Sequence, residues 1–153
     1  MQTDDRAIRN HLTERPRGEG AHVSLPAALK DFPAKLYGVR PEGASHSAWE
    51  VLEHIGFTLH DFLDYSTNPG YLEPSWPDDY WPQSSKPDSN QAWQQSMKAM
   101  QEDLRAFEDL IENPDSNLYA AIPWAKQGQT LLHEVLLAAD HTSYHTGELA
   151  LLR

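Results

Sequence analysis

The C-terminal segment LLHEVLLAADHTSYHTGELALLR restricts the fold more than any other part of the chain. At about 100° per residue, its leucines, valine and alanines cover the whole circumference of a helix, and a helix that is apolar all round is normally buried. Four polar residues interrupt this surface within a sector of roughly 60° on the same wheel: Glu134, His141, His145 and Glu148. The sequence therefore predicts a buried helix from about Thr130 to the C-terminus that carries a narrow line of imidazoles and carboxylates.

Two more long helices are predicted in the middle of the chain. The second main helix extends from Ser45 or Ser47 to about Ser66, because one wide arc of its wheel is apolar and the opposite side is acidic. The third begins after Asp88 or Ser89 and ends near the sequence ENPD. Its apolar residues recur at alternating spacings of four and three, which is typical of a helix-bundle seam: Trp93, Met97, Met100, Leu104 and Phe107.

Shorter helices are expected near the N-terminus. One covers about Thr3 to Glu14, with a capping signal at residues 3–5, and a shorter helical piece covers residues 25–32. Three long helices and a shorter one predict an all-α fold, a four-helix bundle. The length of the chain suits one domain, which we assign to residues 1–153.

The connection between the second and third main helices has an unusual composition. Residues 67–88 contain five prolines, which disfavour regular secondary structure. Their aromatic side chains are too apolar for a solvated linker: Tyr71, Trp76, Tyr80 and Trp81. We therefore expect a long, ordered, proline- and aromatic-rich loop whose rings lie on the bundle. A loop of this length is typical either of a functional site or of a segment that covers the core.

Composition argues against several classes of partner. The net charge of −11 and the absence of a basic stripe disfavour nucleic-acid binding. No apolar run reaches membrane-spanning length, and the N-terminal residues MQTDDRAIRN do not resemble a signal peptide. The chain has no cysteine, which excludes disulfides and thiolate metal ligands. A cytoplasmic protein that acts on a small molecule is the expectation.

The polar line on the last helix requires partners, because burying a polar or charged group without one is costly. His141 and His145 are four residues apart, a spacing that directs two ring nitrogens of a helix to the same point and is common in metal sites. His54, at the border between the apolar and acidic faces of the second main helix, is the candidate third ligand. The alternative is that the histidines are paired with nearby acids and hold no metal.

The sequences SAWEVLEHI and ADHTSYHTGEL, with EGASHSAWEVLEHI as the entry to the second main helix and the loop EPSWPDDYWP, resemble the DinB-like superfamily, also called the DinB/YfiT group. The resemblance implies a four-helix bundle in which His54, His141 and His145 hold a divalent metal such as zinc or nickel, with water completing the coordination. It also implies a homodimer, and extends to relatives that transfer low-molecular-weight thiols such as mycothiol or bacillithiol. Relatives often have Gln where this chain has Glu148.

Three functional hypotheses follow. The first is a metal-dependent thiol transferase or hydrolase for a small molecule, with Glu148 and Glu50 as candidate catalytic residues. Glu148 is alternatively a fourth ligand or a partner of a ligating histidine, and Glu50 and Asp140 are candidates for the latter role. The second is a stress-linked binding module with a structural metal, and the third is a bundle with no metal. His60 and His133 are expected to lie outside the site.

Overall fold

The computed structural model describes residues 5–17 and 20–153, and its regular secondary structure is helical. Five α-helices are present in these ranges: α1 (Arg6–Thr13), α2 (Leu25–Leu29), α3 (Ala48–Thr67), α4 (Asn90–Glu112) and α5 (Leu131–Leu152). The described residues form no strand, and an isolated β-bridge joins Ala121 to Thr130. The predicted all-α class is therefore confirmed.

The three long helices begin where side chains can cap them. Ser47 and Glu50 form a reciprocal capping box at the start of α3, in which each side chain binds the other residue's backbone amide. The side chains of Ser89 and Thr130 accept hydrogen bonds from backbone amides in the first turns of α4 and α5. These starts agree with those expected from the sequence.

The N-terminal helices are shorter than predicted. Helix α1 begins at Arg6, and Asp5 makes no side-chain capping bond, while Thr3 and Asp4 lie outside the described residues. Helix α2 ends at Leu29 rather than at residue 32, because Asp31 adopts a φ of 53°, which does not continue a helix.

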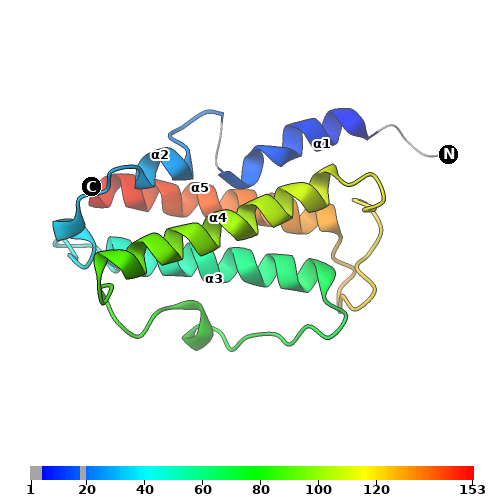
Figure 1. Cartoon of the computed structure of the whole chain (residues 1–153). Coiled ribbons are helices and arrows are strands. Elements are labelled where there is room, and N and C mark those ends of the chain that lie inside the picture. The colour runs from blue at the N-terminus through cyan, green and yellow to red at the C-terminus, as the bar shows by residue number, and fades with distance from the viewer. Residues whose placement is uncertain (1–4, 18–19) are drawn as a thin grey trace.

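The long helices pack around a common core (Figure 1). Helix α3 contacts both α4 and α5, α1 lies against α4, and α2 lies against α5. Four of the five seam residues of α4, Trp93, Met100, Leu104 and Phe107, are fully buried, as their spacing predicted, and Met97 is half-buried against the core. Each such side chain contributes on the order of 2 kcal/mol to stability. No described helix combines the length and the apolar character needed to cross a lipid bilayer.

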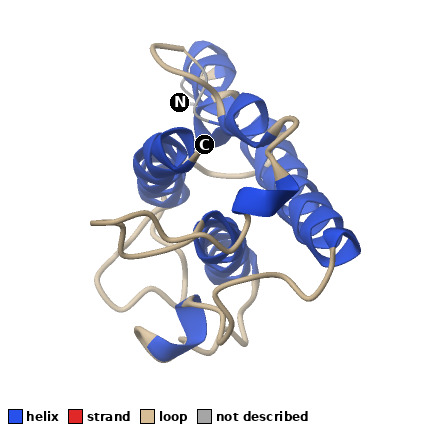
Figure 2. Cartoon of the chain, turned by 90° about the vertical axis from the view of Figure 1, so that its left-hand side faces the viewer, coloured by secondary structure: helices blue, strands red, loops and turns tan. Residues whose placement is uncertain are grey.

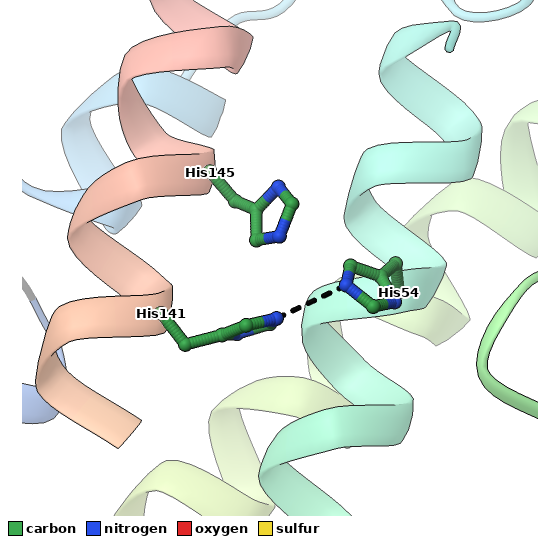
Figure 3. Close-up of side chains that lie close together, drawn as sticks. All are labelled: His54, His141 and His145. Carbon is green, nitrogen blue, oxygen red and sulfur yellow. Dashed lines mark hydrogen bonds between the residues drawn. The ribbon is translucent and has the colours of Figure 1, made fainter. Parts of the chain in front are cut away.

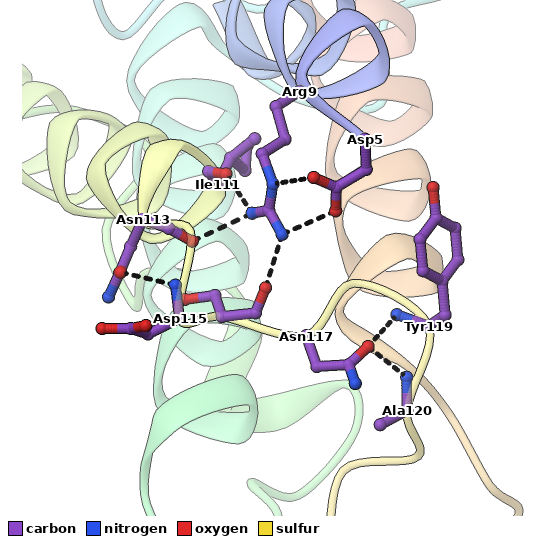
Figure 4. A network of polar contacts seen from close by, with 9 residues as sticks. Asp5, Arg9, Ile111, Asn113, Asp115, Asn117, Tyr119 and Ala120 are labelled. Atoms are coloured by element: carbon purple, nitrogen blue, oxygen red, sulfur yellow. Dashed lines mark hydrogen bonds and ion pairs between the residues drawn. The ribbon is translucent and has the colours of Figure 1, made fainter. Parts of the chain in front are cut away.

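A buried arginine ties α1 to the end of α4 (Figure 4). Arg9 is 7% exposed, and its guanidinium forms an ion pair with Asp5. The same group donates to the backbone carbonyls of Ile111, Asn113 and Ser116 over 2.6, 3.0 and 2.6 Å. Carbonyls at a helix C-terminus lack partners within the helix and carry partial negative charge, so this cation stabilises the end of α4.

Residues 68–89, here called the aromatic strap, connect α3 to α4 and pass along the outer side of α3 (Figures 1 and 2). A short 3₁₀ turn, Asp78–Tyr80, contacts α3. The hydroxyl groups of Tyr71 and Tyr80 both donate to the Asp61 carboxylate of α3, each over 2.8 Å. The strap is therefore fixed to α3 beside His54.

Candidate metal centre

Three histidines from two helices converge between α3 and α5 (Figure 3). His54 projects from α3, and His141 and His145 project from the same side of α5 because they are one helical turn apart. One nitrogen from each ring lies within 4.8 Å of the other two. The structure thus brings together the three residues that the sequence singled out, although His54 lies 87 residues before His141 in the chain.

The ring of His54 is oriented by the aromatic strap. Its Nδ1 atom lies 2.9 Å from the backbone carbonyl oxygen of Tyr80. A carbonyl can only accept, so Nδ1 carries the proton and Nε2 keeps its lone pair. The indole of Trp81 stacks on the imidazole at a centroid distance of 3.9 Å and an interplanar angle of 4°. His54 therefore presents an unprotonated nitrogen to the other two rings.

His145 is oriented by a carboxylate. Its Nδ1 atom donates to Oε2 of Glu148 over 2.5 Å, which leaves Nε2 free as a ligand atom. Glu148 is thus a partner of a candidate ligand, one of the three roles considered for it. Asp140, which was considered for a similar role, has an exposed side chain.

Glu50 is engaged elsewhere. Its carboxylate pairs with the guanidinium of Arg40 and accepts from the Ser47 amide. Burial alone would raise the pKa of Glu50, but the bonds from Arg40 and Ser47 outweigh it and the pKa is lowered. Glu50 is therefore an anion at neutral pH and belongs to the start of α3, one turn from His54.

Burial lowers the pKa of all three histidines. The effect is largest for His141, whose pKa falls to about 3 because burial and the two neighbouring imidazoles disfavour its cation. For His54 and His145, hydrogen bonds to Tyr80 and Glu148 offset only part of the effect. All three rings are consequently neutral at pH 7, the protonation state that a metal ligand requires.

These features fit a divalent metal. The donor set consists of three neutral imidazoles. In His54 and His145 the Nδ1–H group donates a hydrogen bond to an oxygen acceptor, as the second nitrogen of a ligating histidine usually does. His141 differs, because its Nδ1 is buried without a hydrogen-bond partner among the described residues. Its Nε2 lies 3.0 Å from Nε2 of His54 and must donate there, since the His54 atom has no proton.

A cavity of about 380 Å³ adjoins the three rings. Its other walls come from α3 and the strap: Thr58, Asp61, Phe62, Trp76, Tyr80 and Trp81. The cavity places a space for a small molecule beside the histidine nitrogens.

The remaining histidines of interest and Glu134 lie outside the three-histidine cluster. His60 is largely exposed and pairs with Asp103 at 3.4 Å, and the side chain of His133 is 57% exposed, so neither joins the cluster. Glu134, the remaining member of the polar line, is buried, which raises its pKa. His46 stacks on Trp81 at a ring-centroid distance of 3.8 Å.

Sequence reasoning missed the contribution of Asp61 and of the Tyr80 carbonyl. Asp61 lies on the acidic face of its helix, a pattern that predicts solvent exposure, but the strap covers it. A backbone carbonyl has no signature in the sequence. The one available signal was the pair of tyrosines in a loop too apolar for a linker.

Comparison with known proteins gives one family. A model of the DinB superfamily matches residues 19–149, most of the chain and all three histidines. No curated protein and no solved structure matches the chain significantly.

Proposed function

Because the chain belongs to the DinB superfamily, we propose that it is a metal-binding protein in which His54, His141 and His145 hold a divalent ion, zinc or nickel. The observation that carries the proposal is the convergence of three neutral imidazoles from two helices. We also assign the fold to the four-helix bundles, with α1, the 3₁₀ turn Arg15–Arg17 and α2 in the fourth position beside α3, α4 and α5.

The reaction that we propose is transfer of a thiol to, or hydrolysis of, a small molecule in the adjoining cavity. A divalent ion with three neutral ligands keeps its full charge and acidifies a bound water or thiol toward neutral pKa. Tyr80 and Glu148 hold His54 and His145 in the required tautomers. Trp81 covers one face of His54, and Phe62 and Trp76 line the space that a substrate would fill. The thiol cosubstrate is supported by the family resemblance alone.

Metal analysis of the purified protein tests the proposal. After removal of any affinity tag, loading with Zn²⁺ or Ni²⁺ and dialysis, we expect one ion per chain by elemental analysis. His54→Ala, His141→Ala and His145→Ala should each lose it. His60→Ala and His133→Ala are matched controls, because both histidines lie outside the cluster, and should retain it.

Thermal unfolding with and without a chelator separates the proposal from its metal-free alternative. That alternative has one specific observation in its favour, the hydrogen bonds that already join His54 to His141 and His145 to Glu148. A bound ion at a hundred times its Kd stabilises the fold by about 2.7 kcal/mol. A chelator should therefore lower the Tm of the loaded protein. An unchanged Tm, together with no ion in the wild type, would rule out the metal site.

A further inference from the structure

The exposed indole of Trp76 lies at the edge of the histidine cavity, and it bears on the class of substrate that the proposed function would use. Trp76 is 69% exposed, although it lines the cavity. Its ring centroid is 6.4 Å from that of His54 and 5.3 Å from that of Tyr80. A large aromatic surface left in water beside a concave site is a typical binding surface.

The other rings of the cavity already have fixed partners. Trp81 stacks on both His46 and His54, and Phe62 meets the His141 ring edge-on at a centroid distance of 6.2 Å and an angle of 87°. Tyr80 is held by its hydrogen bond to Asp61. Trp76 is thus the wall ring that retains a largely uncovered aromatic surface.

The described walls carry no lysine or arginine. Asp61 is the one carboxylate among the described lining residues, and its two oxygens accept from the hydroxyls of Tyr71 and Tyr80. The hydroxyl of Thr58 is also satisfied, because it donates to the carbonyl oxygen of His54 over 2.8 Å. A negatively charged group on the body of a ligand would therefore lose its hydration without gaining a cationic partner.

We propose that the cavity is an aromatic subsite, which takes a planar ring without negative charge against Trp76 while a donor atom of the same ligand reaches the ion that the three histidines would hold. The volume of about 380 Å³ suits a ligand of this size. Stacking or edge-to-face contact between two rings strengthens binding roughly 3- to 10-fold beyond what the buried area gives. The substrate class is therefore a small aromatic compound whose ring carries no negative charge. This inference rests on the proposed metal site.

Three hydroxamates that share one metal-binding group test the subsite. Acetohydroxamate has a methyl group, cyclohexanecarbohydroxamate has a saturated ring, and benzohydroxamate has an aromatic ring. With the zinc-loaded protein, calorimetry should give benzohydroxamate the lowest Kd, roughly 10-fold below acetohydroxamate and roughly 3-fold or more below the cyclohexyl compound.

Two variants of Trp76 and one control assign the effect. In Trp76→Ala the Kd of benzohydroxamate should rise to within about 3-fold of the Kd of acetohydroxamate, which itself should not change. In Trp76→Phe benzohydroxamate should keep most of its tighter binding. Leu72→Ala is the matched control, because Leu72 lies in the same strap, is 85% exposed and does not line this cavity. It should behave as the wild type.

The outcomes separate this inference from the proposed function. If acetohydroxamate binds but the aromatic ring adds nothing, or if its advantage persists in Trp76→Ala, the subsite is wrong and the metal site stands. If the protein retains no zinc and binds none of the three compounds, both proposals are overturned.

Discussion

The Nε2 atoms of His54 and His141 lie 3.0 Å apart and share a single proton. The proton belongs to His141, because His54 uses its own proton to bind the Tyr80 carbonyl. A metal ion at this point would replace the shared proton, and His141 would then carry its proton on Nδ1. The hydrogen bond between the two rings thus marks the point at which the coordination bonds would form.

Replacing Glu148 should weaken metal binding without removing a ligand. In Glu148→Ala the His145 Nδ1 loses its acceptor, and loss of such a partner typically reduces metal affinity 10- to 100-fold. Glu148→Gln, which keeps an acceptor oxygen but not the charge, should give a smaller loss. Competition with a chromophoric zinc chelator measures the Kd. Asp140→Ala is the control on the same helix, and wild-type affinity in Glu148→Ala would contradict the role of Glu148.

Replacing Asp61 should disturb His54 through the strap. Asp61→Ala frees the hydroxyls of Tyr71 and Tyr80, so the Tyr80 carbonyl is no longer held against the His54 ring. We expect zinc affinity to fall by roughly 10-fold or more. In the metal-free protein, ¹⁵N NMR should show the His54 proton distributed over both ring nitrogens instead of residing on Nδ1.

Asp64→Ala is the matched control for Asp61. Asp64 lies on the same helix and accepts from the side chain of Asn68, away from His54. It should leave the His54 tautomer unchanged. A lower Tm in Asp61→Ala with an unchanged tautomer and zinc affinity would show that Asp61 only stabilises the strap.

The metal-free protein should lose stability as the pH falls below about 6.5. Burial lowers the histidine pKa values, that of His141 from 6.5 to about 3, so below pH 6.5 the unfolded chain binds protons that the folded chain does not. The free energy of unfolding then decreases by up to about 1.4 kcal/mol per pH unit for each imidazole. Urea titrations at pH 7.5, 6.5 and 5.5 measure it. His141→Gln removes one titrating group and should give a shallower slope, whereas an equal slope would contradict the assignment.

Removing the Arg9 guanidinium should destabilise the fold without affecting the metal site. Arg9→Met leaves the carbonyls of Ile111 and Ser116 and the Asp5 carboxylate without their donor, which costs on the order of 3 kcal/mol. Urea unfolding measures the change. Lys98→Ala, which breaks an exposed pair with Glu102, is the control and should change stability by less than about 0.5 kcal/mol.

The parts of the molecule set by helix geometry could be predicted from the sequence. The four-residue spacing of His141 and His145 places them on one side of α5, and the polar residues Ser47, Ser89 and Thr130 mark where long helices begin. The position of His54 at the edge of an apolar arc allowed two orientations, and the family resemblance favoured the inward one. The packing of α3 against α5 places it there.

Contacts that depend on irregular backbone could not be predicted. The Tyr80 carbonyl meets His54 only because the strap folds back along α3. Arg9 looked like one of several polar residues on a short helix, and its carbonyl partners lie more than 100 residues away. The capping role of Glu50 could have been predicted from the sequence, because Ser47 and Glu50 match the Ser-x-x-Glu capping pattern.

Tyr80 joins the strap to the site at two points, through its hydroxyl to Asp61 and through its carbonyl to His54. A ligand that displaced Tyr80 would break both contacts at once. In doing so it would also release the imidazole that Tyr80 orients. Displacement of this one strap residue would therefore free the Nδ1 proton of His54 and undo the tautomer in which Nε2 faces the other two rings.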